Sequence, residues 1–83
     1  MRHARPEDLD PVSALLDDLR SLDGLTEPRP GTFYRGPRAF LHFHIDPAGV
    51  FADLKVDGEF VRNRVTTQRE QRTFLVAVRR AAP

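Results

Sequence analysis

A strict alternation of apolar and polar residues over positions 40–56 constrains the fold of this chain more than any other feature. Leu41, Phe43 and Ile45 share one side of a strand, because side chains along a strand point to alternate faces. Residues 46–49, Asp-Pro-Ala-Gly, then place proline and glycine where a tight turn needs them. A second alternating run follows, so the segment predicts an antiparallel hairpin.

The apolar residues of the two runs also predict how the strands pair. With residues 46–49 as the loop, Ile45 faces Val50 and Leu41 faces Leu54, so that apolar residues meet on one face. A shift of one residue would turn every side chain to the opposite face. The four-residue loop is therefore the expected one.

Two helices are expected at the ends of the chain. Apolar residues at helical spacing predict one helix from about Pro11 to Leu22, followed by an extended connector over residues 25–31. Thr67 and Glu70 have the spacing of a capping box, which begins the second helix.

The other strands follow from turn chemistry. Residues 32–35 predict a short strand, and Asp57-Gly58 is the signature of a two-residue hairpin turn leading into a last strand. We therefore predict an α+β fold in the order α-β-β-β-β-α, with a four-stranded antiparallel meander and both helices on the same face. The residues expected beneath the sheet are Phe33, Leu41, Phe43, Ile45, Val50, Ala52, Leu54, Val56, Val61 and Val65.

Size and composition narrow the function classes. Eighty-three residues suffice for a single domain over 1–83, with 1–5 and 81–83 expected to fray. The net charge of +1 argues against nucleic acid as a partner, although acids gather in the first helix and arginines toward the C-terminus. The absence of cysteine excludes disulfides, thiolate nucleophiles and cysteine zinc sites. No signal-like or membrane-length apolar run appears, so we expect a cytoplasmic protein without a membrane partner.

The candidate site lies on the face of the predicted sheet that the helices do not cover. Asp53 lies at its centre, with His42 directly across on one neighbouring strand and Arg62 on the other, close enough for charge pairing. A carboxylate held by arginine stays ionised and favours the charged form of a nearby histidine. The candidate ligand-binding residues on this outer face are Tyr34, Phe40, His42, His44, Phe51, Asp53, Phe60, Arg62 and Arg64.

Aromatic residues on an exposed face favour a binding role. Exposed apolar patches often mark ligand or partner surfaces, so we expect the outer face to bind a small molecule, another protein or a second copy of the chain. The plainer alternative is a solvated face on which Asp53 pairs with Arg62. Aromatic strands near arginines also suggest base stacking on RNA, but the RNP signature is missing.

An enzyme or metal-assisted site built on His42, His44 and Asp53 is the alternative function. Positions 42–46 have the spacing His-x-His-x-Asp, and two imidazoles two residues apart on a strand reach the same ion. A third ligand would come from Asp53 or His3, whereas Arg62 and its neighbour at 64 would repel a cation. No Ser-His-Asp grouping appears, so the residues favour binding over catalysis, and no cofactor is predicted.

A family resemblance covers roughly residues 31–54. The segments Gly31-Thr-Phe33, Arg38-Ala-Phe40, His42-Phe-His44 and Phe51-Ala-Asp53 resemble the small bacterial domains called luciferase-like, or luciferase-domain, proteins. The resemblance implies a phenylalanine strand, a His-x-His strand, a glycine turn and an aspartate strand. It implies neither light emission nor a catalytic residue, and the chain departs from the pattern beyond Val56, where the family has a longer segment before its last helix.

Overall fold

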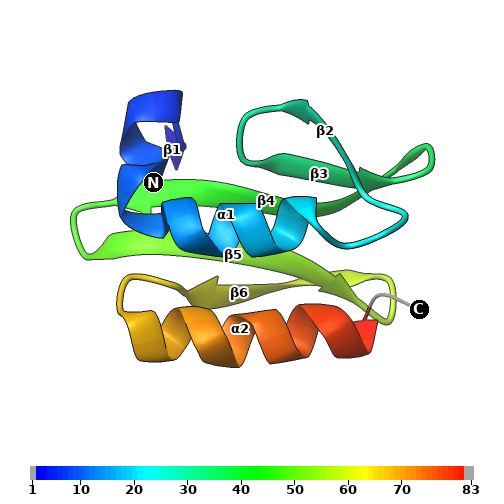
Figure 1. Cartoon of the computed structure of the whole chain (residues 1–83). Coiled ribbons are helices and arrows are strands. Elements are labelled where there is room, and N and C mark those ends of the chain that lie inside the picture. Colours follow the sequence, from blue (N-terminus) through cyan, green and yellow to red (C-terminus); the bar gives the residue numbers. More distant parts are fainter. Residues whose placement is uncertain (1, 82–83) are drawn as a thin grey trace.

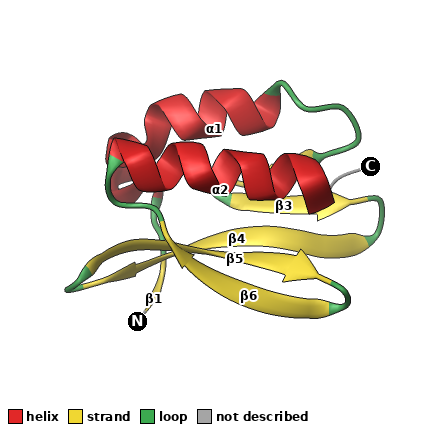
Figure 2. Cartoon of the chain, turned by 90° about the horizontal axis from the view of Figure 1, so that it is seen from below, coloured by secondary structure: helices red, strands yellow, loops and turns green. Residues whose placement is uncertain are grey.

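A computed structural model, which describes residues 2–81, shows one antiparallel sheet with helices on a single face (Figures 1 and 2). The α+β class and the two helices are confirmed, but the sheet has six strands rather than four. In chain order the elements are β1 (Arg2–His3), the 3-10 helix η1 (Pro6–Val12), α1 (Ser13–Arg20), β2 (Thr26–Arg29), β3 (Thr32–Arg35), β4 (Arg38–Asp46), β5 (Gly49–Val56), β6 (Glu59–Arg64) and α2 (Gln68–Ala81).

The two additional strands are short. The strand order is β2-β3-β4-β5-β6, and β1 pairs separately with β4 through Arg2 opposite Ile45 and His3 opposite His44. Next to β1, Ala4 is buried and its amide donates to the carbonyl of Phe43 (3.2 Å), while fraying of the chain ends stays a prediction. Met1 and residues 82–83 lie outside the described residues, and Ala81 ends α2.

The register of the central hairpin is confirmed. Ile45 pairs with Val50 and Leu41 with Leu54. The strands run one residue further than expected, since Asp46 also pairs with Gly49. Gly49 has a φ of +137°, and a Cβ built there would lie 2.3 Å from the Thr66 hydroxyl oxygen. Glycine is needed at this position because Thr66 closes the start of β5 by bonding to the backbone of Val50.

The second hairpin and the second helix also form as expected. Asp57 and Gly58 both have positive φ, at 52° and 84°, as a type I′ turn requires. At the start of α2 the Thr67 hydroxyl accepts from the Glu70 amide (3.1 Å), and the Glu70 carboxylate accepts from the Thr67 amide (3.0 Å). This reciprocal pair is the predicted capping box.

The first helix and the connector differ from the prediction. A 3-10 segment carries Pro11, and the regular α-helix begins only at Ser13. The connector over residues 25–31 contains β2, whose Pro28 lies at the edge of the sheet, where a missing N–H group costs no ladder bond. Short edge strands with proline give little alternation to recognise in a sequence.

Phe40 is the one candidate site residue that belongs to the core. It was expected on the outer face, but it is 3 % exposed and packs in the same cluster as Leu41. The register shifts there, because Phe33 pairs with Leu41 while Tyr34 pairs with Ala39, leaving Phe40 unopposed. A bulge of this kind breaks the period of two, so that consecutive side chains share a face.

Two residues expected beneath the sheet are largely exposed. Val56 and Val61 lie near the tip of the β5–β6 hairpin and are 38 % and 48 % exposed. Near Val56 the residues of α2 that line a shallow groove are Ala77, Arg80 and Ala81, of which only the small alanines are apolar. The buried core is instead formed by Ala4, Leu9, Val12, Leu15, Leu16, Leu19, Phe33, Phe40, Leu41, Phe43, Val50, Ala52, Leu54, Val65, Phe74 and Val78.

The contrast between Phe40 and Phe60 gives a test of this core. Replacing Phe40 by alanine should lower the free energy of unfolding by about 3–5 kcal/mol, as for other buried phenylalanines. Replacing Phe60, which is 43 % exposed, should cost about 1 kcal/mol or less. Urea unfolding followed by circular dichroism measures both, and equal costs would contradict the bulge at Phe40.

Candidate functional site

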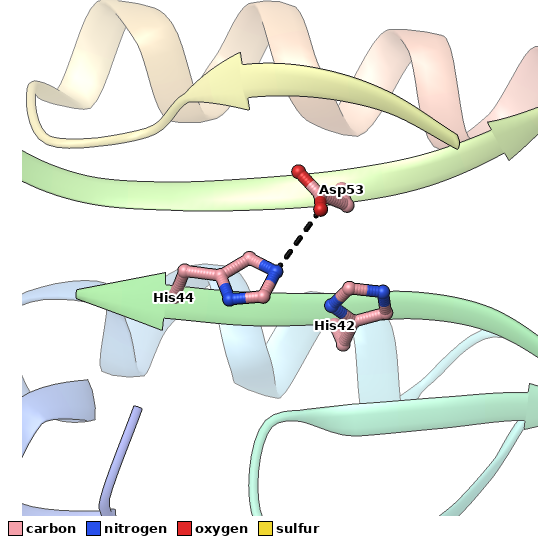
Figure 3. A group of neighbouring side chains, drawn as sticks. All are labelled: His42, His44 and Asp53. Carbon is pink, nitrogen blue, oxygen red and sulfur yellow. Dashed lines mark hydrogen bonds and ion pairs between the residues drawn. The ribbon is translucent and has the colours of Figure 1, made fainter. Parts of the chain in front are cut away.

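The candidate site lies on the sheet face opposite the helices, which no helix of residues 2–81 covers (Figure 2). β4 contributes His42 and His44, and the neighbouring β5 contributes Asp53 (Figure 3). Their side chains share this face because all three occupy outer positions of the confirmed register. The local alternation of the two strands therefore places the cluster.

Two cross-strand rows organise the outer face. In the first row His42 lies opposite Asp53, and Asp53 lies opposite Arg62. In the second row His44 lies opposite Phe51, and Phe51 lies opposite Arg64. The short strands extend both rows: Arg29 and Thr32 continue the first beyond His42, and His3 continues the second beyond His44.

Asp53 is the centre of a polar network. Its side chain is only 9 % exposed and accepts two hydrogen bonds from Arg62, at 2.9 Å from Nε and 3.1 Å from Nη2. A third contact joins Oδ2 to Nε2 of His44 at 3.0 Å (Figure 3). The predicted pairing with Arg62 is thus confirmed. The histidine that bonds Asp53, however, is His44, two residues along the strand from His42, which lies directly opposite Asp53.

The contacts of Asp53 keep it ionised. The paired guanidinium of Arg62 lowers the pKa of Asp53, outweighing the opposing effect of burial, and the nearby imidazole of His44 adds to the lowering. A bidentate arginine pair is among the strongest contacts that a carboxylate can make. The site therefore holds a fixed negative charge near neutral pH.

His42 has a different environment. Its ring lies edge-on to His44, with centroids 4.6 Å apart, and 4.8 Å from the Phe60 ring. Burial lowers the pKa of His42, and repulsion from His44 adds to this, so the attraction of Asp53 is outweighed. Asp53 favours the charged form of His42, as expected, but burial and His44 outweigh this effect, so the pKa of His42 is lowered overall.

The remaining candidate residues separate into three groups. Phe51 and Phe60 border the cluster, with the Lys55 ammonium 5.1 Å from the centre of the Phe60 ring. Arg64 is drawn away, because it pairs with Glu70 at the start of α2 (2.9 Å). Tyr34 pairs with Ala39 beyond the bulge, and Phe40 lies in the core. The structure therefore reduces the site to His42, His44, Asp53 and Arg62, bordered by Phe51 and Phe60.

Two further residues reach the outer face from the short strands. His3 pairs with His44 in the sheet, and burial, followed by the charges of Arg29 and His44, lowers the pKa of His3. The hydroxyl of Thr32, opposite His42, is buried without a hydrogen-bond partner among the described residues. The sequence offered His3 only as a possible third ligand, since a two-residue strand leaves no periodic signal.

The histidines and Asp53 also form a possible ligand set for a metal ion. One donor atom from each of His42, His44 and Asp53 lies within 4.8 Å of the other two. Asp46, which completes the His-x-His-x-Asp spacing, is not in this group. Its carboxylate instead accepts from the amide of Ala48 inside the turn (2.9 Å). The cross-strand register, rather than the linear spacing, thus brings a carboxylate beside the two histidines.

Comparison of the chain with family models, with curated proteins and with solved structures finds no match in any of the three. The resemblance of residues 31–54 to luciferase-like domains stays a prediction. Across residues 2–81, no helix has the length and apolar character needed to cross a membrane.

The electrostatics of the site predict a set of titrations. The pKa of His42 should lie below its ordinary value of about 6.5, and Asp53→Asn should lower it further by removing a nearby negative charge. Arg62→Gln should raise the pKa of Asp53, because it removes the contact that lowers this pKa most. Titration of the side chains by two-dimensional NMR measures all three shifts.

The lowered pKa of Asp53 also makes the stability of the fold depend on pH. Because folding lowers the pKa of Asp53, its contribution to the free energy of unfolding is fully present above about pH 4 and is lost as the pH falls through the lowered value. Wild type should therefore lose more stability than Asp53→Asn between pH 5 and pH 2. Equal losses would contradict the ion pair.

Proposed function

We propose that this chain is a small binding domain whose outer sheet face is the binding surface, and that its ligand is a divalent transition-metal ion. The observation that carries the proposal is the convergence of His42, His44 and Asp53 from two strands onto donor atoms within 4.8 Å of one another. Two imidazoles and a carboxylate suit zinc and the related first-row ions.

The closest pair of donors already has a suitable separation. Two ligands about 2.0–2.2 Å from one ion, at angles between octahedral and tetrahedral, lie about 3.0–3.5 Å apart. Nε2 of His44 and Oδ2 of Asp53 are 3.0 Å apart. The third donor atom, a ring nitrogen of His42, lies within 4.8 Å of the other two. Three protein ligands leave an open position, which a small oxygen or nitrogen ligand can occupy.

The protonation states also favour metal binding. Metal ligands must be deprotonated, and the lowered pKa values leave Asp53 ionised and His42 neutral at pH 7. Arg62 competes for the carboxylate, but its side chain is 52 % exposed and can move into solvent. In the absence of metal, Arg62 supplies the positive charge that a partly buried carboxylate requires.

Titration with Zn²⁺ by isothermal calorimetry, and with Co²⁺ by visible absorption, tests the proposal. We expect one ion per chain. Replacing His42 or His44 by alanine, or Asp53 by asparagine, should weaken binding by more than the roughly 10- to 100-fold that follows loss of an outer contact.

Asp46→Asn is the matched control, because Asp46 belongs to the linear motif but not to the cluster. It should bind Zn²⁺ as wild type does. Absence of saturable uptake by the wild-type chain would refute the metal proposal, and an equal loss in Asp46→Asn would refute the assignment of ligands.

A second candidate is an organic ligand or a protein that covers the aromatic border of the site. The observation in its favour is Phe60, which is 43 % exposed yet lies against the ring of His42. Exposed aromatic surface beside polar groups is typical of ligand sites.

NMR screening of metal-free protein with aromatic carboxylate fragments tests this second candidate. We expect shifts at His42 and Phe60, which Phe60→Ser should reduce. Shifts confined to other parts of the chain would count against it.

A further inference from the structure

The two edges of the sheet are built differently. β2, at one edge, has four residues, contains Pro28 and pairs irregularly with β3. β6, at the other edge, has six residues without proline and pairs with β5 without a register shift. Proteins normally protect edge strands from pairing with another chain by proline, bulges and shortness. Only the β2 edge has these protections.

The apolar surface of the chain also favours the β6 edge. Phe60 and Val61, adjacent on β6, are 43 % and 48 % exposed, among the few large apolar side chains so exposed in residues 2–81. Figure 2 shows α2 on the helix face of the sheet, and in the view of Figure 1 it lies just past β6. The residues of β6 are nevertheless exposed, except for Asn63, which is half-buried. No strand of the described residues pairs with the outer side of β6.

The charges on β6 do not block this edge. Arg62 pairs with Asp53 and Arg64 pairs with Glu70, so each arginine is neutralised within its own chain. Charged residues discourage edge pairing when they must be desolvated or face like charges. A strand that pairs with β6 would meet arginines that already have a carboxylate partner.

We infer that β6 pairs antiparallel with β6 of a second copy of this chain, joining two sheets into one across a two-fold axis at Val61. This inference does not rest on the proposed metal site. It also differs from the expected homodimer through the outer face, because it leaves that face open in both copies.

The backbone fits this arrangement. The amide of Val65 donates to Val50, and bonded positions alternate along an antiparallel ladder, so Val61 and Asn63 also bond toward β5. Phe60 and Arg62 therefore direct their amides and carbonyls toward the free edge. With Val61 on the axis, Phe60 of one copy lies opposite Arg62 of the other, and these groups bond to one another.

The side chains of β6 favour one pairing register of the two copies over the other. A continuous sheet requires outer residues to face outer residues, which leaves axes at Val61 or at Arg62 as the central choices. An axis at Arg62 places two arginines directly opposite each other, which is unfavourable. An axis at Val61 pairs valine with valine, Phe60 with Arg62 and Glu59 with Asn63, giving apolar, cation–π and hydrogen-bonding contacts.

Single-cysteine cross-linking tests both the edge and the register, since the chain contains no cysteine. Directly opposite residues of a non-bonded pair have Cα atoms about 4.5 Å apart, within the range that a disulfide spans. Val61→Cys should therefore form a covalent dimer under mild oxidation, at least tenfold more than Asn63→Cys, whose copies lie several residues apart. Arg62→Cys should cross-link preferentially only if the two-fold axis lies at Arg62 instead.

Sedimentation of the uncross-linked protein completes the test. Wild type should dimerise with increasing concentration, and Val61→Lys should weaken the dimer at least tenfold, because lysine at an edge opposes pairing. A monomeric wild type at high concentration would overturn the inference. So would a dimer that Val61→Lys leaves intact, or preferential cross-linking of Arg62→Cys.

Discussion

The pairing register of β4 and β5 is the constraint on which the rest of this structure depends. Because Ile45 meets Val50, alternate residues over 41–45 and 50–54 lie beneath the helices, and the residues between them lie on the open face. The core and the polar cluster are two results of one alignment. Gly49 and Thr66 secure it at the turn, where a larger residue than glycine would collide with the threonine side chain.

The electrostatics of the open face follow from the different contacts of Asp53 and His42. Asp53 is buried but receives a bidentate arginine and an imidazole, so its charged form is favoured. His42 is half-buried beside a histidine and an aromatic ring, so its neutral form is favoured despite the carboxylate opposite. The lowered pKa values thus favour the deprotonated form of both the Asp53 carboxyl and the His42 imidazole. This combination suits a cation held by nitrogen and oxygen ligands better than it suits an acid–base pair.

The strands at the borders of the sheet differ in the groups they expose. β1 adds an imidazole beside His44 and buries Ala4, while β2 closes one edge with proline and a bulge. β6 keeps a regular, unpaired edge whose exposed residues are self-complementary about Val61. Arg62 and Phe60 belong to β6 and also lie beside the polar cluster, so the open face and the free edge meet at this strand.

The sequence by itself determined the class of fold, both central hairpins, the capping box of α2 and the pairing of Asp53 with Arg62. These features depend on periodicity and turn chemistry within about twenty residues of chain. Only the tertiary structure decided that Phe40 enters the core, that residues 2–3 and 26–29 form strands, and that His44 rather than His42 bonds Asp53. A bulge, a short edge strand and a diagonal side-chain contact each depend on how separate segments meet in space, which alternation along one strand does not encode.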